Sequence, residues 1–490
     1  MFRTLRHLLL PVLNALGALL VMLSLTMFVP LGIAYRDNEA TMLGFAISIA
    51  ITAGAGLALF FMTRRKKREL EARDGFLLVT LSWLAVALFS SIPFYLLLPN
   101  ISYNNLFFES VSCLTTTGAS ALNNLDELPI SINYWRCLLS WLGGMGILVL
   151  AVAILPLLGV GGSQVFKAEN TNLFKDSKLT PRIADTAKAL YSIYVFFSLL
   201  CVLGYHWAGM NWDEAFMFMF TTMSLSGISP YDASIGHFNS SAIEMVAVLF
   251  IIFSGFNFSL HFMAWRQRSI LSYFVDSEAR AWLLILIFGT ALVCGILMLN
   301  NTYLTWEETL RHALFSVASI FSTTGYVSAD FAAWPPVIGA FLLFCGLFAS
   351  CSGSTGGGVK LIRVLILIKH GFLTLEKLIR PRAYLPLRLG NQNITDSLVL
   401  NIFSFLSLHL LVVSICTFII LATGVDFVTA FSSVWACIGN IGPGLGEVGP
   451  MNNYAWCNPV HLWVGAFCMF VGRLELFTVF VIFSRSFWRT

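Results

Sequence analysis

The sequence predicts an all-α polytopic membrane protein in which one pattern, a helix, a short helix, a glycine loop and a second helix, occurs four times after two N-terminal helices. Three observations lead to this fold class. The 490 residues are 58% hydrophobic and only 11% charged, whereas a soluble protein carries about 25% charged residues. Apolar runs long enough to cross a bilayer core of about 30 Å recur along the chain. Between them lie shorter apolar segments, each of which leads into a glycine.

Ten apolar runs are expected to cross the membrane. They lie near residues 8–33, 42–62, 75–98, 136–160, 188–209, 241–265, 281–300, 335–368, 396–423 and 459–484. The first run follows Arg3 and Arg6, but it is longer than the core of a signal peptide and has no obvious cleavage site. We therefore expect it to remain in the protein as a spanning helix.

The distribution of charge predicts the orientation of the chain. With the N-terminus in the cytoplasm, the inner loops carry most of the lysines and arginines, including the basic run RRKKR at 64–68. The outer loops keep only Arg36, Arg136 and Arg311 and hold many acidic residues instead. This arrangement obeys the positive-inside rule. The basic run is also expected to contact the head groups of membrane lipids.

Four shorter segments, of about ten to fifteen residues, are too short to span and fit re-entrant helices. They lie near 104–114, 212–222, 307–321 and 427–437. Aligned on the glycine that follows each of them, they read FFESVSCLTTTGAS, FMFMFTTMSLSGIS, LFSVASIFSTTGYV and FSSVWACIGNIGPG. This internal repeat divides the chain into residues 1–70, which hold the two N-terminal helices, and four units at 71–165, 166–270, 271–375 and 376–490.

The four glycine loops predict one central pore. Non-helical backbone at membrane depth is tolerated only where it is buried in protein or lines a water-filled cavity. Four such loops in register can satisfy one another around one axis and point their carbonyl oxygens at it. A ring of carbonyls replaces the water shell of a cation, as in potassium-channel filters, and glycine allows the backbone conformations that these loops need. Ordinary turns between helices, or a secondary transporter with broken helices, are the alternatives.

Several motifs resemble those of a known superfamily. They are TTTGAS (115–120), WRCLLSWLGGMGILVLAVAILP (135–156), KLTPRIADTAKALYSIY (178–194), STTGY (322–326), GSTGGGVK (353–360), GNIGPG (439–444) and GRLE (472–475). Over essentially its whole length the chain resembles the Trk/Ktr/HKT superfamily of cation-conducting proteins, and most closely its Trk potassium-uptake branch, the TrkH/TrkG type. The resemblance implies potassium uptake through one pore per chain, in a homodimer of the bacterial inner membrane. It also implies a cytosolic, nucleotide-binding ring of the TrkA type that gates the pore.

The resemblance further implies which residues hold the ion. The candidate potassium-binding residues of the selectivity filter are Thr116, Thr117, Gly118, Leu225, Ser226, Gly227, Thr323, Thr324, Gly325, Asn440, Ile441 and Gly442. In this superfamily a serine in place of the first filter glycine accompanies sodium transport, so Gly118 favours potassium. The fourth loop departs from the first and third because no hydroxyl residue directly precedes its glycine. Cation:proton or sodium-coupled secondary transport through the same central site stays open as the alternative.

A break in one apolar run predicts a gate. The run from Pro335 to Ile368 is interrupted by the small residues SGSTGGG at 352–358. A break at this depth must face protein or water, and the helix that contains it begins shortly after the third glycine loop. We therefore expect residues 350–358 to cross the pore below the filter and to move as a gate; a kink that only lets helices pack closely is the alternative. The candidate gate residues are Ser352, Gly353, Ser354, Thr355, Gly356, Gly357, Gly358 and Lys360, and, by resemblance, Arg473.

Other signals point away from an enzyme. The GSTGGGVK motif fails the phosphate-loop pattern because Val359 precedes its lysine and Leu361 follows it. No acid/base pair, nucleophile triad or metal-ligand cluster stands out in the sequence, so we expect no catalytic activity and no cofactor in this chain, with K⁺ as the transported ion and the nucleotide on the partner ring. A net charge of +4 gives no reason to expect a nucleic-acid partner. Glu109, in the first short segment, is expected to support the filter backbone by a hydrogen bond rather than to bind the ion.

Overall fold

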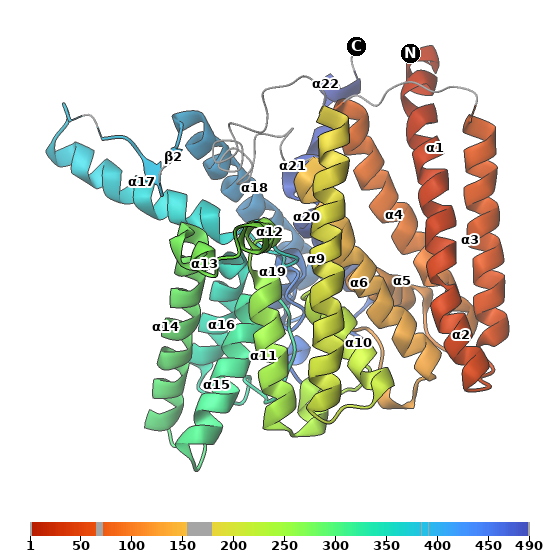
Figure 1. The fold of residues 1–490 in the computed structure, drawn as a ribbon, viewed down its shortest axis with the longest axis horizontal. Helices are drawn as coiled ribbons and strands as arrows, with labels where there is room; N and C mark the ends of the chain where they lie inside the picture. Colours follow the sequence, from red (N-terminus) through yellow and green to blue (C-terminus); the bar gives the residue numbers. More distant parts are fainter. Residues whose placement is uncertain (1, 65–71, 154–178, 384, 391, 489–490) are drawn as a thin grey trace.

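The computed structural model describes residues 2–64, 72–153, 179–383, 385–390 and 392–488. These residues form helices that stand largely side by side, and α1 starts at the same end of the molecule at which α22 lies (Figure 1). Within the described residues, six helices are long and apolar enough to cross a membrane, or eight if each of two sharply bent helix pairs is one span. The architecture is the all-helical, multi-span one that the sequence predicts.

The N-terminal hairpin is held together by small residues. It consists of α1 (Phe2–Thr26), α2 (Phe28–Arg36) and α3 (Met42–Thr63). A Cβ built on Gly17 would lie 2.7 Å from the Phe60 nitrogen, and one built on Gly56 would lie 2.9 Å from the Gly17 oxygen. Small residues of this kind let helices approach closely in lipid, where hydrophobic burial drives little association. The Asn14 amide also donates to the Phe60 carbonyl at 3.0 Å, so backbone proximity and a polar contact together join α1 to α3.

After the hairpin, one order of elements recurs four times (Figure 1). The sets are α4 (Ala72–Leu97), α5 (Tyr103–Leu114) and α6 (Ile130–Ala153); α9 (Leu179–Trp207), α10 (Trp212–Met223), α11 (Ser241–Gly255) and α12 (Phe258–Gln267); α14 (Ser277–Leu299), α15 (Trp306–Phe321), α16 (Pro336–Ala349) and α17 (Leu361–Ile379); and α18 (Asp396–Leu421), α19 (Phe427–Gly439), α20 (Pro459–Arg473) and α21 (Leu476–Phe480). Short elements connect or follow them: α13 (Leu271–Val275), α22 (Arg485–Trp488), the 3-10 helices η1 (Leu125–Glu127), η2 (Ser234–Phe238), η3 (Gly446–Val448) and η4 (Val481–Phe483), and the antiparallel strands β1 (Arg388–Leu389) and β2 (Gln392–Asn393).

The four predicted short helices are α5, α10, α15 and α19, and each begins at a polar cap. The side chain of the cap residue accepts the backbone N–H three residues further on, which satisfies one of the free donors of a helix start. The four bonds run from Asn105 to Ser102 at 3.4 Å, from Glu214 to Asn211 at 2.8 Å, from Glu308 to Thr305 at 3.2 Å and from Thr429 to Asp426 at 3.0 Å. One capping rule thus sets where all four short helices start.

Two runs that the sequence presents as single spans, 241–265 and 459–484, each form two helices with a sharp bend between them. The axes of α11 and α12 differ by 90°, and those of α20 and α21 by 108°. At the first bend the Asn257 side chain accepts the Ser259 N–H at 2.9 Å and caps a new helix. At the second, Glu475 has a left-handed φ of 58°. The break predicted in the run 335–368 is present, because α16 ends at Ala349 and α17 begins at Leu361.

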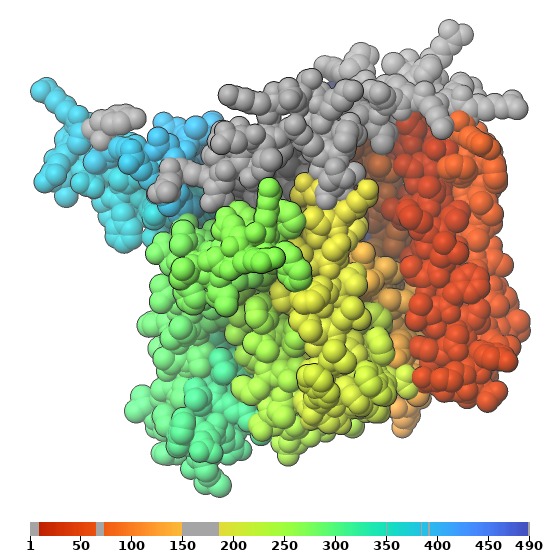
Figure 2. All heavy atoms as spheres, viewed as in Figure 1, coloured from red at the N-terminus to blue at the C-terminus, as the bar shows by residue number. Residues whose placement is uncertain are grey.

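Helix α17 extends sideways from the body of the molecule as an arm (Figure 2). One side of this helix carries apolar side chains at helical spacing that remain exposed. They are Ile368, Phe372, Leu375 and Ile379, with Leu378 beside them. A stripe of this kind on a helix is normally buried against another apolar surface.

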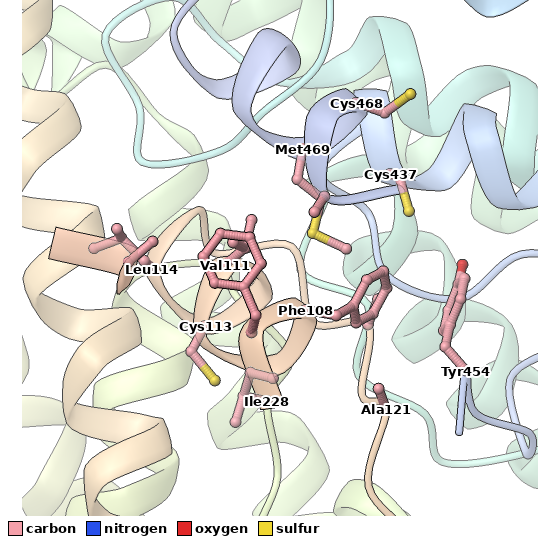
Figure 3. Packing of buried hydrophobic residues seen from close by; sticks show 14 of the residues in the cluster. Phe108, Val111, Cys113, Leu114, Ala121, Ile228, Cys437, Tyr454, Cys468 and Met469 are labelled. Carbon is pink, nitrogen blue, oxygen red and sulfur yellow. The ribbon is translucent and has the colours of Figure 1, made fainter. Parts of the chain in front are cut away.

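The largest hydrophobic cluster joins the first set of helices to the last. Phe108 of α5 lies beside Tyr454 and Met469 (Figure 3), and its ring centroid is 5.3 Å from that of Tyr454. The absence of a side chain at Gly465 makes room for this packing, since a Cβ there would lie 2.9 Å from the Phe108 ring. The packing of α5 against α20 therefore brings the first set of helices into contact with the last.

Candidate functional site

Each of the four short helices ends in the same backbone turn. A positive φ follows each helix end, at Thr116 (52°), Leu225 (53°), Thr323 (62°) and Asn440 (51°). The next N–H then bonds back to the carbonyl five residues earlier: Thr117 to Ser112, Ser226 to Thr221, Thr324 to Ser319 and Ile441 to Ala436, at 2.8 to 2.9 Å. This is a Schellman turn, which satisfies the last carbonyls of a helix. All four chain segments thus leave their helix in the same way.

The four glycines follow these turns and lie against one another's loops. Their φ values are also positive, at Gly118 (85°), Gly227 (70°), Gly325 (80°) and Gly442 (95°). A Cβ built on each would collide with a carbonyl oxygen of the next loop: Gly118 with Ser226, Gly227 with Thr324, Gly325 with Ile441, and Gly442 with Thr117. These contacts run from the first loop to the second, third and fourth and back to the first. The loops therefore form a closed ring, in which glycine is required both for its φ and for the close approach.

The oxygens in these contacts are backbone carbonyls, each from the residue directly before a glycine. The hydroxyls of the same residues bond to other protein groups instead. Thr117 Oγ1 bonds Thr115 Oγ1 at 2.8 Å, Ser226 Oγ donates to Ser140 Oγ at 3.0 Å, and Thr324 Oγ1 bonds Ser322 Oγ at 2.6 Å. The ring thus presents backbone oxygen whatever the side chain, which explains how Ile441 fits the fourth loop without a hydroxyl.

Asn440 links the fourth loop to the first. Asparagine tolerates the left-handed conformation better than most residues, and its side-chain Nδ2 donates to Thr117 Oγ1 at 2.9 Å and to the Met469 carbonyl at 3.2 Å. The predicted departure of the fourth loop from the others is therefore accommodated by a direct contact across the ring.

A cavity of about 440 Å³ opens on one side of the ring. All four ring glycines line it, together with polar groups that include Ser120, Asn123, Asn452 and Asp232. The volume is ample for a cation with its water shell. This mouth, whose lining also includes Arg136, leads to the four carbonyls.

The 350–358 loop lies against the ends of three of the short helices. Thr355 Oγ1 donates to the Met223 carbonyl of α10 at 3.0 Å, and the Gly357 N–H donates to Thr323 Oγ1, just after α15, at 2.8 Å. A Cβ on Gly357 would lie 2.5 Å from the Gly439 carbonyl oxygen of α19. Ser354, Thr355, Gly356 and Gly357 are buried. The loop thus contacts the ends of the same helices from which the ring loops begin.

Both ends of the 350–358 loop are fixed by polar groups. Glu278 Oε1 accepts the Ser352 N–H at 2.7 Å and the Ile362 N–H at 3.2 Å. Lys360 Nζ donates to the Gly356 carbonyl at 2.6 Å and to Ser350 Oγ at 3.2 Å.

Within the loop, Ser354 Oγ donates to the Cys351 carbonyl at 2.7 Å. Gly353 abuts the bend between α11 and α12, because its carbonyl accepts the Phe258 N–H at 3.1 Å and a Cβ on it would lie 2.6 Å from Asn257 Oδ1. Gly358, at the other end, has a φ of 75° and a Cβ on it would collide with the Leu347 carbonyl oxygen.

Arg473 reaches the 350–358 loop from the end of α20. Its Nη1 donates to the Thr355 carbonyl at 2.9 Å, and only 2% of the residue is exposed. Glu475, two residues later, pairs instead with Arg363 of α17 at 2.6 Å. Among the described residues Arg473 has no ion-pair partner, and its Nε and Nη2 atoms have no hydrogen-bond acceptor. A cationic side chain therefore faces the loop from below the ring.

The structure places the predicted site residues in the ring and in the 350–358 loop, and several further residues hold these segments in place. All twelve predicted filter residues lie in the ring or its turns, and the predicted gate residues lie in or against the 350–358 loop. Asn257 and Glu278 were not anticipated, and Arg363 was not among the candidate gate residues. The sequence signal for Asn257 is a cap residue after Ser254 and Gly255 inside an apolar run. For Glu278 and Arg363, charges next to or within apolar runs are a signal, since such residues normally face a partner.

The chain matches a family of known proteins. The family model TrkH, described as cation transport protein, matches residues 38–489. The chain belongs to the TrkH family. A Trk system potassium uptake protein TrkH of Halomonas elongata is 43% identical over 481 residues, covering 98% of this chain and 99% of the relative. The corresponding protein of Escherichia coli K12 is 40% identical, covering 96% and 98%, and a Trk system potassium uptake protein TrkG from the same organism is 34% identical, covering 97% of each.

A solved structure of the same family has the same fold. The crystal structure of the potassium transporter TrkH from Vibrio parahaemolyticus superimposes with a TM-score of 0.92 at 38% sequence identity, covering 98% of this chain and all of that one. The TrkH family consists of cation transport proteins, so this chain is a multi-pass membrane protein for cation transport and not an enzyme.

Proposed function

We propose that this chain takes up potassium ions across the cytoplasmic membrane of a bacterium, through the ring of four glycine loops. The observation that carries the proposal is the closed order of the ring, in which each glycine lies against the carbonyl before the next glycine. Four carbonyls held in this way can replace the water shell of a dehydrated cation. The relatives named for potassium uptake, at up to 43% identity, support potassium as that cation.

In this proposal the twelve residues of the ring and its turns form the selectivity filter. The backbone carbonyls before Gly118, Gly227, Gly325 and Gly442 bind K⁺. The residues with positive φ that precede them, such as Thr116 and Asn440, set the direction of those carbonyls. Gly118 supports selectivity for potassium over sodium, since it leaves the first loop as close to its neighbour as the other three loops are.

The 350–358 loop is the gate in this proposal. Its bonds to Met223, Thr323 and Arg473 close the path at rest. Glycines at 353 and 356–358 lower the cost of a second backbone state, which a hinge requires. Lys360 and Arg473 add positive charge beneath the filter, which repels a cation while the loop is in place.

The proposed assembly is a homodimer with a cytosolic, nucleotide-binding ring of the TrkA type. A second copy would cover the exposed apolar stripe of α17, from Ile368 to Ile379. The N-terminus is cytoplasmic, so that Arg64 and the residues after it face the inside. We keep the division into 1–70, 71–165, 166–270, 271–375 and 376–490 as the proposed modular organisation, with K⁺ as the cargo and no cofactor in this chain.

Flux measurements on the purified protein in liposomes test the proposal. Potassium, rubidium, sodium and pH gradients are imposed one at a time, with and without the nucleotide ring. We expect rubidium and potassium influx along their own gradients and a smaller sodium flux. Potassium movement driven uphill by a proton or sodium gradient would instead establish the alternative, cation:proton or sodium-coupled secondary transport. Absence of any potassium or rubidium flux from folded protein, with or without the ring, would contradict the proposed function.

A further inference from the structure

A fully buried ion pair lies directly behind the first glycine loop. Arg136 of α6 donates from Nε and Nη2 to Glu109 Oε1 of α5, at 2.9 and 2.7 Å. The second carboxylate oxygen of Glu109 accepts the Ala121 N–H at 2.8 Å and the Ser120 hydroxyl at 3.0 Å. Both charged side chains are 0% exposed. The hydrogen bond expected from Glu109 to the loop backbone is therefore present, as part of a larger network.

The same arginine also reaches the second glycine loop. Arg136 Nη1 donates to the Ser229 carbonyl at 2.8 Å and to Asn133 Oδ1 at 2.9 Å. Ser120 and Ser229 occupy matching places, each two residues after the glycine of its own loop. The planar guanidinium, whose donors have a fixed geometry, thus ties two neighbouring loops together just beyond the ring.

This tie exists at one place in the ring. At the position of Glu109, nine residues before the ring glycine, the other short helices carry Phe218, Ser316 and Ser433. The network bonds three groups of the first two loops, the Ser120 hydroxyl, the Ala121 N–H and the Ser229 carbonyl, and a charge buried in this way cannot lose its partner without a large cost. The place where the first loop meets the second is therefore held by ionic hydrogen bonds that the other three loop pairs do not have at this position.

We propose that Glu109 and Arg136 are positioning residues that set the discrimination between potassium and sodium. The inference rests on the proposed function. Neither residue touches the ion; they fix the distance between the first and second loops, and so the spacing of the Thr117 and Ser226 carbonyls. A ring held at the size of K⁺ cannot contract around the smaller Na⁺. With the tie removed, these two carbonyls can relax inward and accept sodium.

The test measures the ratio of sodium to potassium flux in proteoliposomes for E109Q, R136Q and the double variant E109Q/R136Q. We expect the ratio to rise about tenfold, equivalent to about 1.4 kcal/mol. Arg136→Lys keeps the charge but not the fork of donors, so it should also raise the ratio. The matched control is the pair Arg311–Glu244, with contacts of 2.7 and 2.8 Å between α15 and α11. In the described part of the chain it makes no hydrogen bond to a glycine loop. R311Q and E244Q should lower the thermal midpoint and leave the ratio unchanged.

The outcomes separate this inference from the proposed function. A selective wild-type protein, together with folded variants whose flux ratio equals that of the wild type, would overturn the inference alone. A wild-type protein without potassium flux would instead overturn the proposed function. If E109Q and R136Q do not reach the membrane, Arg136→Lys and Ser120→Ala decide, since each removes part of the network and retains the charge pair. If Arg136→Lys and Ser120→Ala change the thermal midpoint but leave the ratio of sodium to potassium flux unchanged, Glu109 and Arg136 have a purely structural role.

Discussion

At the scale of single residues, the ring depends on conformations that its side chains disfavour. Positive φ is uncommon outside glycine and is an outlier for β-branched residues, yet Thr116 and Thr323 adopt it, as does Leu225. Each such residue costs about 1–3 kcal/mol unless the surroundings hold it. Here the hydrogen bonds of the Schellman turns and the complete burial of these residues hold them in this conformation. These turns could not be predicted from the sequence. Glycine is the usual residue with positive φ after a helix end, and of the four residues found there only Asn440 tolerates that conformation comparably.

Replacing Gly118 by serine should raise sodium flux relative to potassium flux several-fold. The new Cβ would collide with the Ser226 carbonyl oxygen, and serine disfavours a φ of 85°, so the two loops must separate and the carbonyl ring loses its fit to K⁺. Proteoliposome flux with each cation measures the ratio. Gly295→Ser is the control, because no atom lies within 4 Å of a Cβ at that position in α14. Equal ratios in wild type and Gly118→Ser would show that this glycine is not part of the filter.

Replacing Arg473 by glutamine should increase potassium flux in the absence of the nucleotide ring. The change removes a positive charge below the filter and weakens the 2.9 Å bond to the Thr355 carbonyl. A hydrogen bond from a charged group is worth about 1.5–3 kcal/mol, so the closed state should lose most of its population advantage. Stopped-flow or rubidium-tracer flux measures the rise. Arg473→Lys retains the charge and should stay near the wild-type rate; a glutamine variant that is no faster than wild type would rule out this role.

At the scale of elements, the second helices of the last three sets are interrupted within the described residues, and the interruptions contact one another. The bend between α11 and α12 lies against Gly353, and the bend between α20 and α21 places Glu475 on Arg363 at 2.6 Å. The 350–358 loop thus lies between the bend that joins α11 to α12 and the bend that joins α20 to α21. A change at any one of these breaks has a direct contact through which to reach the others.

Deleting Ser352–Gly357 should raise potassium flux and make it independent of the nucleotide ring. The deletion removes the bonds to Met223 and Thr323 that hold the loop against the short helices. Flux is measured with and without the ring, and thermal stability in detergent confirms that the variant is folded. Gly353→Ala provides a milder version, since its Cβ would lie 2.6 Å from Asn257 Oδ1. A folded deletion variant that still conducts only on activation would mean that the gate lies elsewhere.

The elements also show what sequence reasoning can and cannot reach. The four short helices were predicted within two residues of their ends, because apolar length and a following glycine agree. The bends at Asn257 and Glu475 were missed because the runs remain apolar on both sides of them. The pairing of Glu109 with Arg136 could not be predicted either, since the two lie 27 positions apart on different helices and only the fold brings them together.

At the scale of the whole molecule, we expect the basic segments at 161–187, 266–280 and 371–395 to face the cytoplasm and to bind a soluble partner; residues 161–178 lie outside the described residues. They are too long for tight turns and carry several arginines and lysines. We expect purification from the native host in mild detergent to recover a soluble ring with a dinucleotide-binding fold. High salt should release it, because contacts between exposed charges are screened. Recovery of the membrane dimer alone, at low salt and in mild detergent, would contradict this prediction.

The ring is built from four different loops of one chain. A channel made of four identical subunits receives every substitution four times, so any change near its axis must be tolerated in all quadrants at once. Here a substitution alters one quadrant and leaves three intact. That freedom accounts for a ring in which asparagine and isoleucine stand in one quadrant where threonines stand in two others. Ion preference in such a chain can therefore drift by small evolutionary steps, one quadrant at a time.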